Sequence, residues 1–294
     1  MKKNIIVIAG PTGVGKTKLS VSLAKIINGE IINADSMQFY KDLNIGTAKI
    51  KEEEKEGIPH HLFDIIDVEK MYTIYDYQKD CRKKILEIEK ANKTPILVGG
   101  SGLYIRSALY DYKLEEENEK VDLSNYTNEE LLNKCKEIDE RCNIHVNNRK
   151  RLERFINCNM NNQEIKKDSK PLYNFIIIGL TTERENLYNI INKRVDKMIE
   201  EGLVDEVMKL YNKNIRSKAI MTGIGYKELY QYFDNKITLD EAIELIKKNS
   251  RHLAKRQYTF FNNQFDMKWF NTDYNNFNNT VEEVFNYLKD KKVV

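Results

Sequence analysis

Short apolar runs recur along the chain, and segments with apolar residues at helical spacing separate them. The runs lie at residues 4–9, 30–36, 94–100, 173–180 and 267–270. An uninterrupted apolar run such as NIIVIA is typical of a parallel strand that is buried on both faces of a sheet. The pattern therefore predicts the strands of a mostly parallel sheet.

Helices are predicted between and after these strands. The first carries Leu19, Leu23, Ile26 and Ile27 at the three- and four-residue intervals of one helix face. Further helices are expected over residues 73–91, 184–200, 203–213, 223–233, 239–263 and 279–290. Alternation of strands and helices indicates an α/β fold with a doubly wound parallel sheet flanked by helices.

The pattern changes around residue 113. From there to about residue 171 the sequence is charged, rich in asparagine and without a convincing strand. We therefore expect residues 113–171 to form a mostly helical inserted subdomain. Residues 1–112 and 172–294 then form the α/β core, with a largely helical C-terminal part.

Charge is distributed unevenly, although the net charge is only +3. Residues 113–140 hold four basic and ten acidic side chains, whereas residues 141–170 hold eight basic and three acidic ones. A second basic cluster consists of Lys247, Lys248, Arg251, Lys255 and Arg256. On composition alone, each cluster is either a binding surface for an anionic partner or a solvated helix face.

Cysteine usage and the N-terminus bear on the compartment. The four cysteines form no CxxC pair and no cluster with zinc-ligand spacing, which favours reduced thiols in the cytoplasm. The apolar stretch at the N-terminus, about six residues, is too short for a signal peptide or a membrane span. We expect a soluble, cytoplasmic protein without a membrane partner, and a monomer.

Residues 10–17, GPTGVGKT, match a phosphate-binding loop between a predicted strand and a predicted helix. Glycines let backbone N–H groups converge on an anion at the helix N-terminus. Lys16 can neutralise phosphate charge, and Thr17 can hold a Mg²⁺ ion. The residues expected to line the phosphate are Gly10, Pro11, Thr12, Gly13, Val14, Gly15, Lys16 and Thr17.

The other parts of an ordinary ATPase are missing from the sequence. Such an enzyme has an apolar strand that ends in a metal-binding Asp. Here PILVGG ends in Gly99 and Gly100, and Asp35 is the acid that closes a predicted strand. No motif for adenine or guanine specificity follows. The loop therefore binds phosphate without the rest of an ATPase.

Eight segments occur in an order that points to one family. They are GPTGVGKT (10–17), DSMQFYKDLNIGTAK (35–49), GIPHHLFDIID (57–67), ILVGGSGLYI (96–105), KRLER (150–154), INKRVDKMIEEGLVDEV (191–207), GIGYKE (223–228) and AKRQYTF (254–260). In these segments the chain resembles the tRNA dimethylallyltransferases, or IPP transferases. The resemblance implies a P-loop NTPase-like core and transfer of a dimethylallyl group to N6 of adenine-37 beside the tRNA anticodon.

The resemblance also implies roles around the phosphate loop. The loop would hold the diphosphate of dimethylallyl diphosphate, with Mg²⁺ as cofactor. Arg194 matches an arginine that reaches this diphosphate, and Thr12 matches a positioning hydroxyl near the reacting centre. Asp35 matches the general base that takes a proton from N6, which the poorly nucleophilic amine requires. From the residues alone, two alternatives stay open. Asp35 can instead cap the following helix or order Mg²⁺-bound water, and Arg194 can form a surface ion pair with Asp196 or Glu200.

A flipped adenine would enter a channel through the core. Gln38 is suited to reading an adenine edge, and Phe39 or Tyr40 either stacks on the base or packs in the core. The family match assigns contacts with tRNA to Asp35, Ser36, Met37, Gln38, Ser101, Lys150, Arg151, Arg154, Tyr226, Lys227, Arg251 and Lys255. Lys248, Arg251 and Lys255 share one helix face, which suits a track for RNA phosphates. His60 and His61 lack the spacing and third ligand of a metal site, and we interpret them as structural.

The sequence departs from the family at two places. Ile190 stands where the family often has an arginine, four residues before Arg194. Where the family has a Thr-Trp pair followed by a basic residue, this chain has Thr259, Phe260, Phe261 and Asn262. These changes leave one diphosphate contact and part of the late basic track in doubt.

Three alternative functions remain open. An adenylate dimethylallyltransferase would use the same loop and aspartate on free AMP, ADP or ATP, without the basic faces. A small-molecule kinase would need a nucleoside triphosphate site, for which no base-binding motif is visible. An RNA-binding module without catalysis would explain the basic faces but not the loop together with Asp35.

Overall fold

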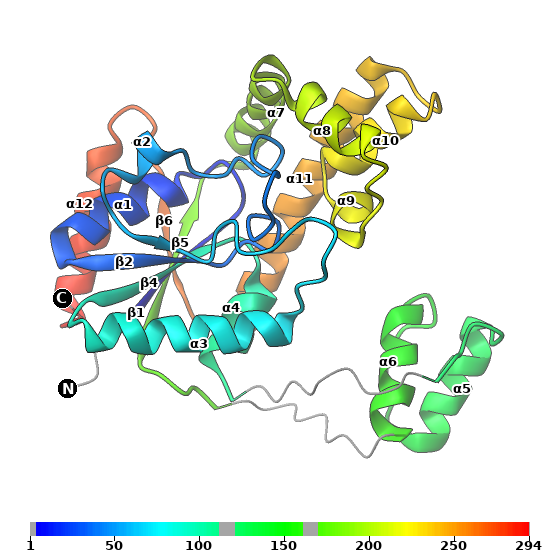
Figure 1. The fold of residues 1–294 in the computed structure, drawn as a ribbon. Coiled ribbons are helices and arrows are strands. Elements are labelled where there is room, and N and C mark those ends of the chain that lie inside the picture. Colours follow the sequence, from blue (N-terminus) through cyan, green and yellow to red (C-terminus); the bar gives the residue numbers. More distant parts are fainter. Residues whose placement is uncertain (1–3, 112–120, 161–169, 294) are drawn as a thin grey trace. The chain divides into compact units, whose positions relative to one another are not determined.

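A computed structural model of the protein describes residues 4–111, 121–160 and 170–293. Its centre is a six-stranded sheet in the order β3-β2-β4-β1-β5-β6, in which every neighbouring pair is parallel (Figure 1). The strands are β1 (Ile5–Ala9), β2 (Gly29–Asn33), β3 (His60–His61), β4 (Thr94–Gly99), β5 (Phe175–Thr181) and β6 (Lys268–Asn271). The sheet belongs to the predicted α/β class.

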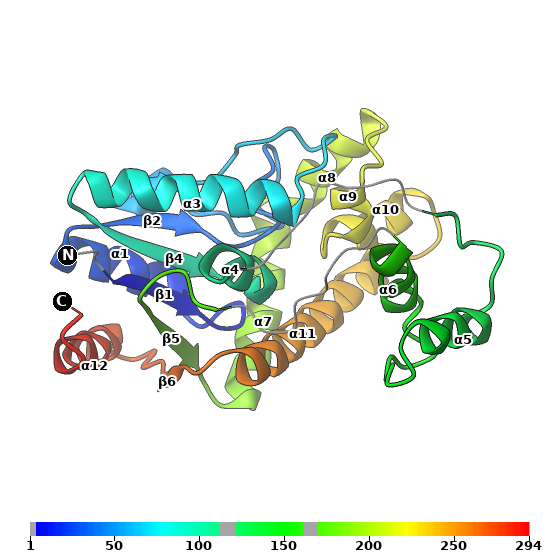
Figure 2. The same cartoon turned by 90° about the horizontal axis from the view of Figure 1, so that it is seen from below.

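Helices cover both faces of the sheet, because alternate side chains of each strand point to opposite faces. Ile6 and Ile8 of β1 pack with α1 (Lys16–Ile27) and α12 (Phe277–Asp290) on one face (Figure 2). Ile5 and Val7 pack with α3 (Ile74–Lys90) and α4 (Gly102–Leu109) on the other. The central strand is therefore buried on both sides, as its uninterrupted apolar sequence predicts.

A third apolar cluster joins the C-terminal helices to the segment that follows β2. Its core includes Leu43, Val207, Leu229 and Ile246. The helices are α7 (Arg184–Glu200), α8 (Leu203–Asn212), α9 (Lys218–Thr222), α10 (Tyr226–Phe233) and α11 (Leu239–Gln264). This helical layer lies beyond the end of the sheet and packs on residues 37–45.

Residues Asp111–Lys170 form a separate compact unit, here called the insertion, and Met1–Tyr110 with Pro171–Val294 form the core unit. The insertion contains α5 (Asn128–Ile138) and α6 (Arg149–Met160). Leu131, Cys135, Leu152 and Ile156 make a small apolar core of its own. Arg149 ties the insertion together by donating hydrogen bonds to Glu153, Tyr126, Leu123 and Asn128.

The structure differs from the sequence predictions mainly at short elements. The predicted strands are present, and His60–His61 adds a short edge strand through pairing with Ile31 and Ile32. The helix predicted over 223–233 starts at Tyr226, and the separate helix α9 precedes it. Short helix α2 (Glu52–Lys55) and helix α4 were not predicted. In the described ranges, no helix combines the length and the apolar character needed to cross a membrane.

Candidate active site

The phosphate loop connects β1 to α1 at the carboxyl edge of the sheet. Gly10 has a φ of 138°, and a Cβ there would lie 2.5 Å from the carbonyl oxygen of Leu180 on neighbouring β5. Only glycine fits this close approach of two backbones. Thr272, just after β6, donates a hydrogen bond to the carbonyl oxygen of Val14 at 2.8 Å. The loop is thus held in a fixed shape by the ends of two strands.

Lys16 turns back over the loop and donates a hydrogen bond from Nζ to the carbonyl oxygen of Pro11 at 2.6 Å. Burial lowers the pKa of Lys16 to about 8; the carboxylate of Asp35 partly opposes this effect and the guanidinium of Arg194 adds to it. The lysine therefore lacks a full counter-charge. An anion in the loop would supply one and would raise the pKa of Lys16 again.

Asp35 follows β2, and Asn33 fixes its backbone. The N–H of Asp35 donates to Asn33 Oδ1 at 2.8 Å, and Asn33 Nδ2 donates to the carbonyl oxygen of Leu62 at 3.0 Å. Asp35 Oδ1 accepts from the N–H of Met37 at 3.1 Å, so one carboxylate oxygen caps the turn. The other oxygen has no hydrogen bond to a described residue. Capping and proton transfer are thus compatible roles for one side chain.

Arg194 extends from α7 toward the same carboxylate. Burial lowers the pKa of Arg194, and Asp35 and Glu54 act in the opposite direction. Within the described ranges Arg194 forms no ion pair, whereas Asp196 pairs with Lys247 at 2.8 Å. The surface ion pair considered for Arg194 is therefore absent. The fold brings Lys16, Asp35 and Arg194 into one electrostatic neighbourhood from three separate elements.

Residues that follow Asp35 line the same edge of the sheet. Ser36, Met37 and Gln38 are partly exposed. Ser101 precedes α4, and its Oγ accepts a hydrogen bond from the N–H of Ser36 at 3.2 Å. Gln38 donates from Nε2 to the carbonyl oxygens of Thr47 at 3.0 Å and Ala48 at 3.4 Å. The segment expected to meet the base thus lies beside the candidate catalytic carboxylate.

Three aromatic residues from the sequence predictions are buried. Phe39 is fully buried among the rings of Tyr72, Tyr77 and Tyr104, and Tyr40 is 8% exposed. Of the two alternatives left open for Phe39 and Tyr40, the structure shows packing in the core, which covers both rings. Tyr226, predicted to contact tRNA, is 1% exposed and donates a hydrogen bond to Glu206 at 2.7 Å. Tyr226 therefore packs inside the core unit, and the prediction that it contacts tRNA is wrong.

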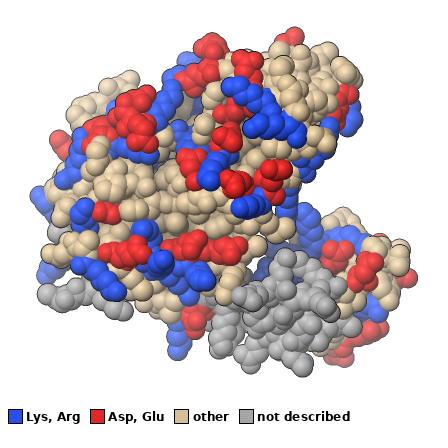
Figure 3. All heavy atoms as spheres, viewed as in Figure 1, with Lys and Arg blue, Asp and Glu red and all other residues tan. Residues whose placement is uncertain are grey.

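The predicted basic contacts fall into two groups. Lys150, Arg151 and Arg154 are exposed on α6 of the insertion. On α11 of the core unit, Lys248 and Lys255 are exposed, whereas Arg251 donates to Asn192 Oδ1 at 2.6 Å. Lys227 on α10 lies 3.6 Å from the carboxylate of Glu228. On the face drawn in Figure 3, acidic and basic side chains are interspersed. The local basic groups named above are the candidates for RNA contact.

The two departures from the family pattern fill space with apolar groups. Ile190 packs its Cγ2 methyl group against Gly13 of the phosphate loop. Phe261 is fully buried, and Phe260 packs on Gly102 at the start of α4. Asn262 accepts a hydrogen bond from the indole N–H of Trp269 at 3.0 Å. These positions stabilise the core unit and add no positive charge.

Two further residues near the site were missed in the sequence. Tyr104 of α4 is partly exposed. Desolvation raises its pKa to about 12, and the nearby Tyr40 and Asp35 raise it further in the same direction. Gln257 of α11 donates to the carbonyl oxygen of Gly100 at 3.0 Å, and its Oε1 is buried without a partner among the described residues. Both lie in segments that carry the family resemblance, SGLYI and AKRQ, and that match was the only available signal.

A parallel sheet whose first strand leads through a glycine-rich loop into a helix defines an α/β protein of the P-loop class. The partly buried side chains of Lys16 and Arg194 around that loop indicate a site for a phosphorylated ligand. The IPP transferase family model matches residues 38–264. The chain belongs to this family.

Individual relatives agree over the whole length. The chain is 47% identical to a tRNA dimethylallyltransferase of Anoxybacillus flavithermus, with 99% of this chain and 98% of the relative covered. It resembles the crystal structure of a tRNA isopentenylpyrophosphate transferase from Bacillus halodurans with a TM-score of 0.80 and 40% identity, over 99% and 97% of the two chains. A structure described as a eukaryotic dimethylallyltransferase acting on tRNA matches with a TM-score of 0.78 and 30% identity, over 92% and 74%.

Proposed function

We propose that the protein transfers a dimethylallyl group from dimethylallyl diphosphate to N6 of adenine-37 in tRNA. The observation that carries the proposal is the grouping of Lys16, Arg194 and Asp35 at the carboxyl edge of the sheet. Two cations suit a diphosphate, and a carboxylate suits a proton acceptor. The names of the relatives supply tRNA and the dimethylallyl group, and the family resemblance supplies adenine-37 and the diphosphate donor.

In the proposed reaction, the C1–O bond of the donor breaks and the diphosphate leaves with the bonding electrons. Lys16, the loop N–H groups and Arg194 are placed to stabilise the negative charge that develops on it. Both side chains are partly desolvated before the ligand binds, which strengthens their attraction to an anion. Thr12 is partly exposed in the loop and is proposed as a positioning hydroxyl.

Thr17 fits the requirements of a Mg²⁺ ligand beside the diphosphate. It lies in the first turn of α1, is exposed, and its hydroxyl has no hydrogen bond to another described residue. Mg²⁺ keeps several waters and needs few protein ligands when phosphate oxygens are present. In the described ranges, no cluster of acidic, His or Cys side chains offers a separate metal cage. When bound, the ion would neutralise part of the diphosphate charge.

Asp35 is proposed to accept the proton from N6 as the N6–C1 bond forms. The amine of adenine is conjugated with the ring, so it gains nucleophilicity only as its proton departs. Asp35 Oδ1 remains on the N–H of Met37, and the oxygen without a hydrogen bond is available for the proton. The products are the N6-prenylated adenine, diphosphate and the protonated carboxyl group, which returns its proton to solvent.

Label transfer tests the proposal. Protein, Mg²⁺ and labelled dimethylallyl diphosphate are mixed with an unmodified tRNA that carries A36-A37-A38, or with AMP. We expect label at A37 and a loss of roughly 10²- to 10⁴-fold in the single-turnover rate for Asp35→Asn, which keeps an oxygen for the N–H of Met37. Label in AMP alone would identify an adenylate dimethylallyltransferase. Transfer to neither acceptor would refute the proposed reaction.

A further inference from the structure

Glu206 of α8 makes an unusual set of contacts with the loop formed by residues 44–49. Its Oε2 accepts hydrogen bonds from the N–H groups of Asn44 at 3.1 Å and Ile45 at 2.8 Å. Its Oε1 accepts from the N–H of Gly46 at 3.1 Å and from the hydroxyl of Tyr226 at 2.7 Å. One carboxylate thus binds three consecutive backbone N–H groups, an arrangement that proteins use to hold anions.

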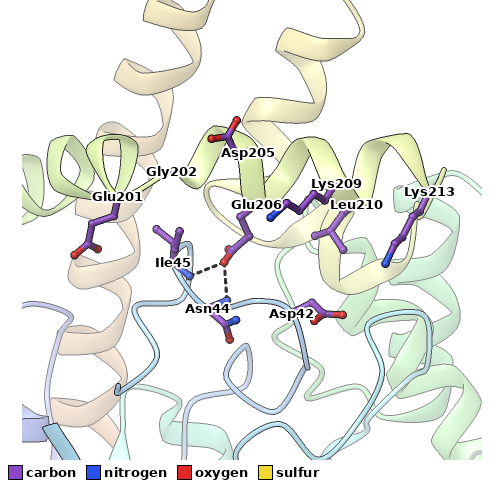
Figure 4. A pocket seen from close by; sticks show the side chains of 10 residues that line it. All are labelled: Asp42, Asn44, Ile45, Glu201, Gly202, Asp205, Glu206, Lys209, Leu210 and Lys213. Carbon is purple, nitrogen blue, oxygen red and sulfur yellow. Dashed lines mark hydrogen bonds between the residues drawn. The ribbon is translucent and has the colours of Figure 1, made fainter. Parts of the chain in front are cut away.

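The surrounding hollow is separate from the candidate active site. It has a volume of about 390 Å³, and four acidic and two basic side chains line it (Figure 4). None of the phosphate-loop residues lines it, nor does Asp35. Figure 4 shows the carboxylate of Glu206 turned toward Asn44 and Ile45, away from the neighbouring Asp205. Glu206 therefore acts on the loop.

The same loop holds the side chain of Gln38. Gln38 Nε2 donates to the carbonyl oxygens of Thr47 and Ala48, which directly follow the three N–H groups bound by Glu206. Lys49 closes the loop from the other side by donating to the carbonyl oxygen of Tyr40 at 2.7 Å. Tyr226 packs so closely on Gly46 that a Cβ there would lie 2.7 Å from the ring. Glu206 therefore acts together with Tyr226 and Lys49 to hold the loop to which Gln38 is bonded.

We propose that Glu206 is a positioning residue: through the loop of residues 44–48 it orients the side-chain amide of Gln38 so that only Oε1 is offered to the substrate base. The proposal rests on the proposed function for the identity of that base. Because Nε2 is already used by two carbonyl groups, Gln38 can accept a hydrogen bond but has no donor left to give. Such a side chain favours a base with an exocyclic amine, as in adenine, over one with a carbonyl oxygen, as in hypoxanthine.

Asp205→Asn is the matched control for Glu206→Gln. Both residues lie in the first turn of α8, so both substitutions remove one negative charge from the same place. Asp205 is exposed and makes no hydrogen bond to another described residue, so its substitution should leave the loop unchanged. In Glu206→Gln, by contrast, the new NH₂ group would face backbone N–H groups, and two donors cannot form a hydrogen bond. Glu206→Asp, which keeps the charge but is shorter by one methylene group, replaces Glu206→Gln if that variant does not fold.

The first measurement follows the side-chain amide signals of Gln38 in nitrogen-15 spectra, assigned with Gln38→Ala. We expect Glu206→Gln to shift these signals and to speed their exchange with water, and Asp205→Asn to leave them unchanged. Unchanged signals in Glu206→Gln would overturn the proposal. This readout does not depend on activity, so it remains decisive even if the wild type fails to prenylate tRNA and the proposed function is refuted.

The second measurement is a double-mutant cycle on prenylation of an anticodon stem-loop. We expect Glu206→Gln to lower kcat/KM roughly ten- to a hundredfold, since small misplacements at a site have effects of this size. The loss should nearly vanish in the Gln38→Ala background, and the preference for A37 over inosine-37 in binding should fall equally in both single variants. Equal losses in both backgrounds, with the preference intact, would mean that Glu206 only supports the fold.

Discussion

The phosphate loop and the base-facing segment of residues 35–49 lie at the same edge of the sheet but are built in different ways. The loop consists of eight consecutive residues, six between β1 and α1 and two in the first turn of α1, and its anion-binding groups include its own N–H groups. The base-facing segment is held by Glu206 and Tyr226, more than 150 positions further along the chain. A local motif specified the first region, whereas distant helices complete the second.

The difference shows how a family match should be interpreted residue by residue. In the phosphate loop, the matching residues are the ones that can touch the ligand. In GIGYKE, the matching residue Tyr226 is buried and supports the segment that faces the substrate. A match therefore marks a residue that the site requires, and only the structure distinguishes contact from support.

Substitution of Arg194 should have the largest effect on the rate. Arg194 belongs to neither region, and it is proposed to contact the diphosphate from α7. Arg194→Gln should lower the single-turnover rate roughly 10²- to 10³-fold, since a donor aimed at developing charge is lost. Binding of tRNA should change little. The measurement is a quenched-flow time course with saturating tRNA and donor. Arg184→Gln is a control on the same helix, because Arg184 is exposed and its guanidinium lies on the ring of Tyr188 in the next turn. Equal rates for the two variants would remove Arg194 from the mechanism.

The pH dependence of diphosphate binding tests the loop by itself. The pKa of Lys16 in the free protein is about 8, lowered from its ordinary value chiefly by burial, and a bound anion should raise it. Below pH 8 the lysine is already charged; above it, binding must take up a proton, so the Kd should rise up to about tenfold per pH unit.

Titration calorimetry with inorganic diphosphate between pH 7 and 9.5, in buffers of different ionisation enthalpy, measures both the Kd and the proton uptake. Lys16→Arg is the control, because its guanidinium stays charged over this range. In Lys16→Arg, the Kd should vary with pH only as far as the ionisation of diphosphate itself changes. A wild-type Kd that follows the variant at every pH would contradict the lowered pKa.

Tyr226→Phe should have the smallest effect and tests whether the base-facing segment depends on its support. The substitution removes one donor to the Glu206 carboxylate and keeps the ring over Gly46. We expect a loss of about 1–3 kcal/mol in the free energy of unfolding, typical of a hydrogen bond to a charged group. Urea denaturation measures it. If Tyr226 instead touched RNA, the variant would keep its stability and lose affinity for the anticodon stem-loop.

Much of the fold could be predicted because its elements are long and periodic. Strands β1, β4 and β5 and helices α3, α7 and α11 follow their apolar patterns closely. His60–His61 could not be predicted as a strand, because two residues carry no period and only pairing with β2 defines them. The choice for Phe39 stayed open and Tyr226 was misassigned, because an aromatic side chain looks the same in sequence whether it packs in a core or contacts RNA.

The sequence by itself determined the phosphate loop, since the groups that bind the anion are neighbours in the chain and the glycines needed for their geometry are visible in the motif. It also marked Asp35 and Arg194 as candidates. Only the tertiary structure decided that Lys16, Asp35 and Arg194 share one electrostatic neighbourhood, and that Glu206 holds the loop to which Gln38 is bonded. These relations depend on distances between residues far apart in sequence, and the packing of helices on the sheet sets such distances.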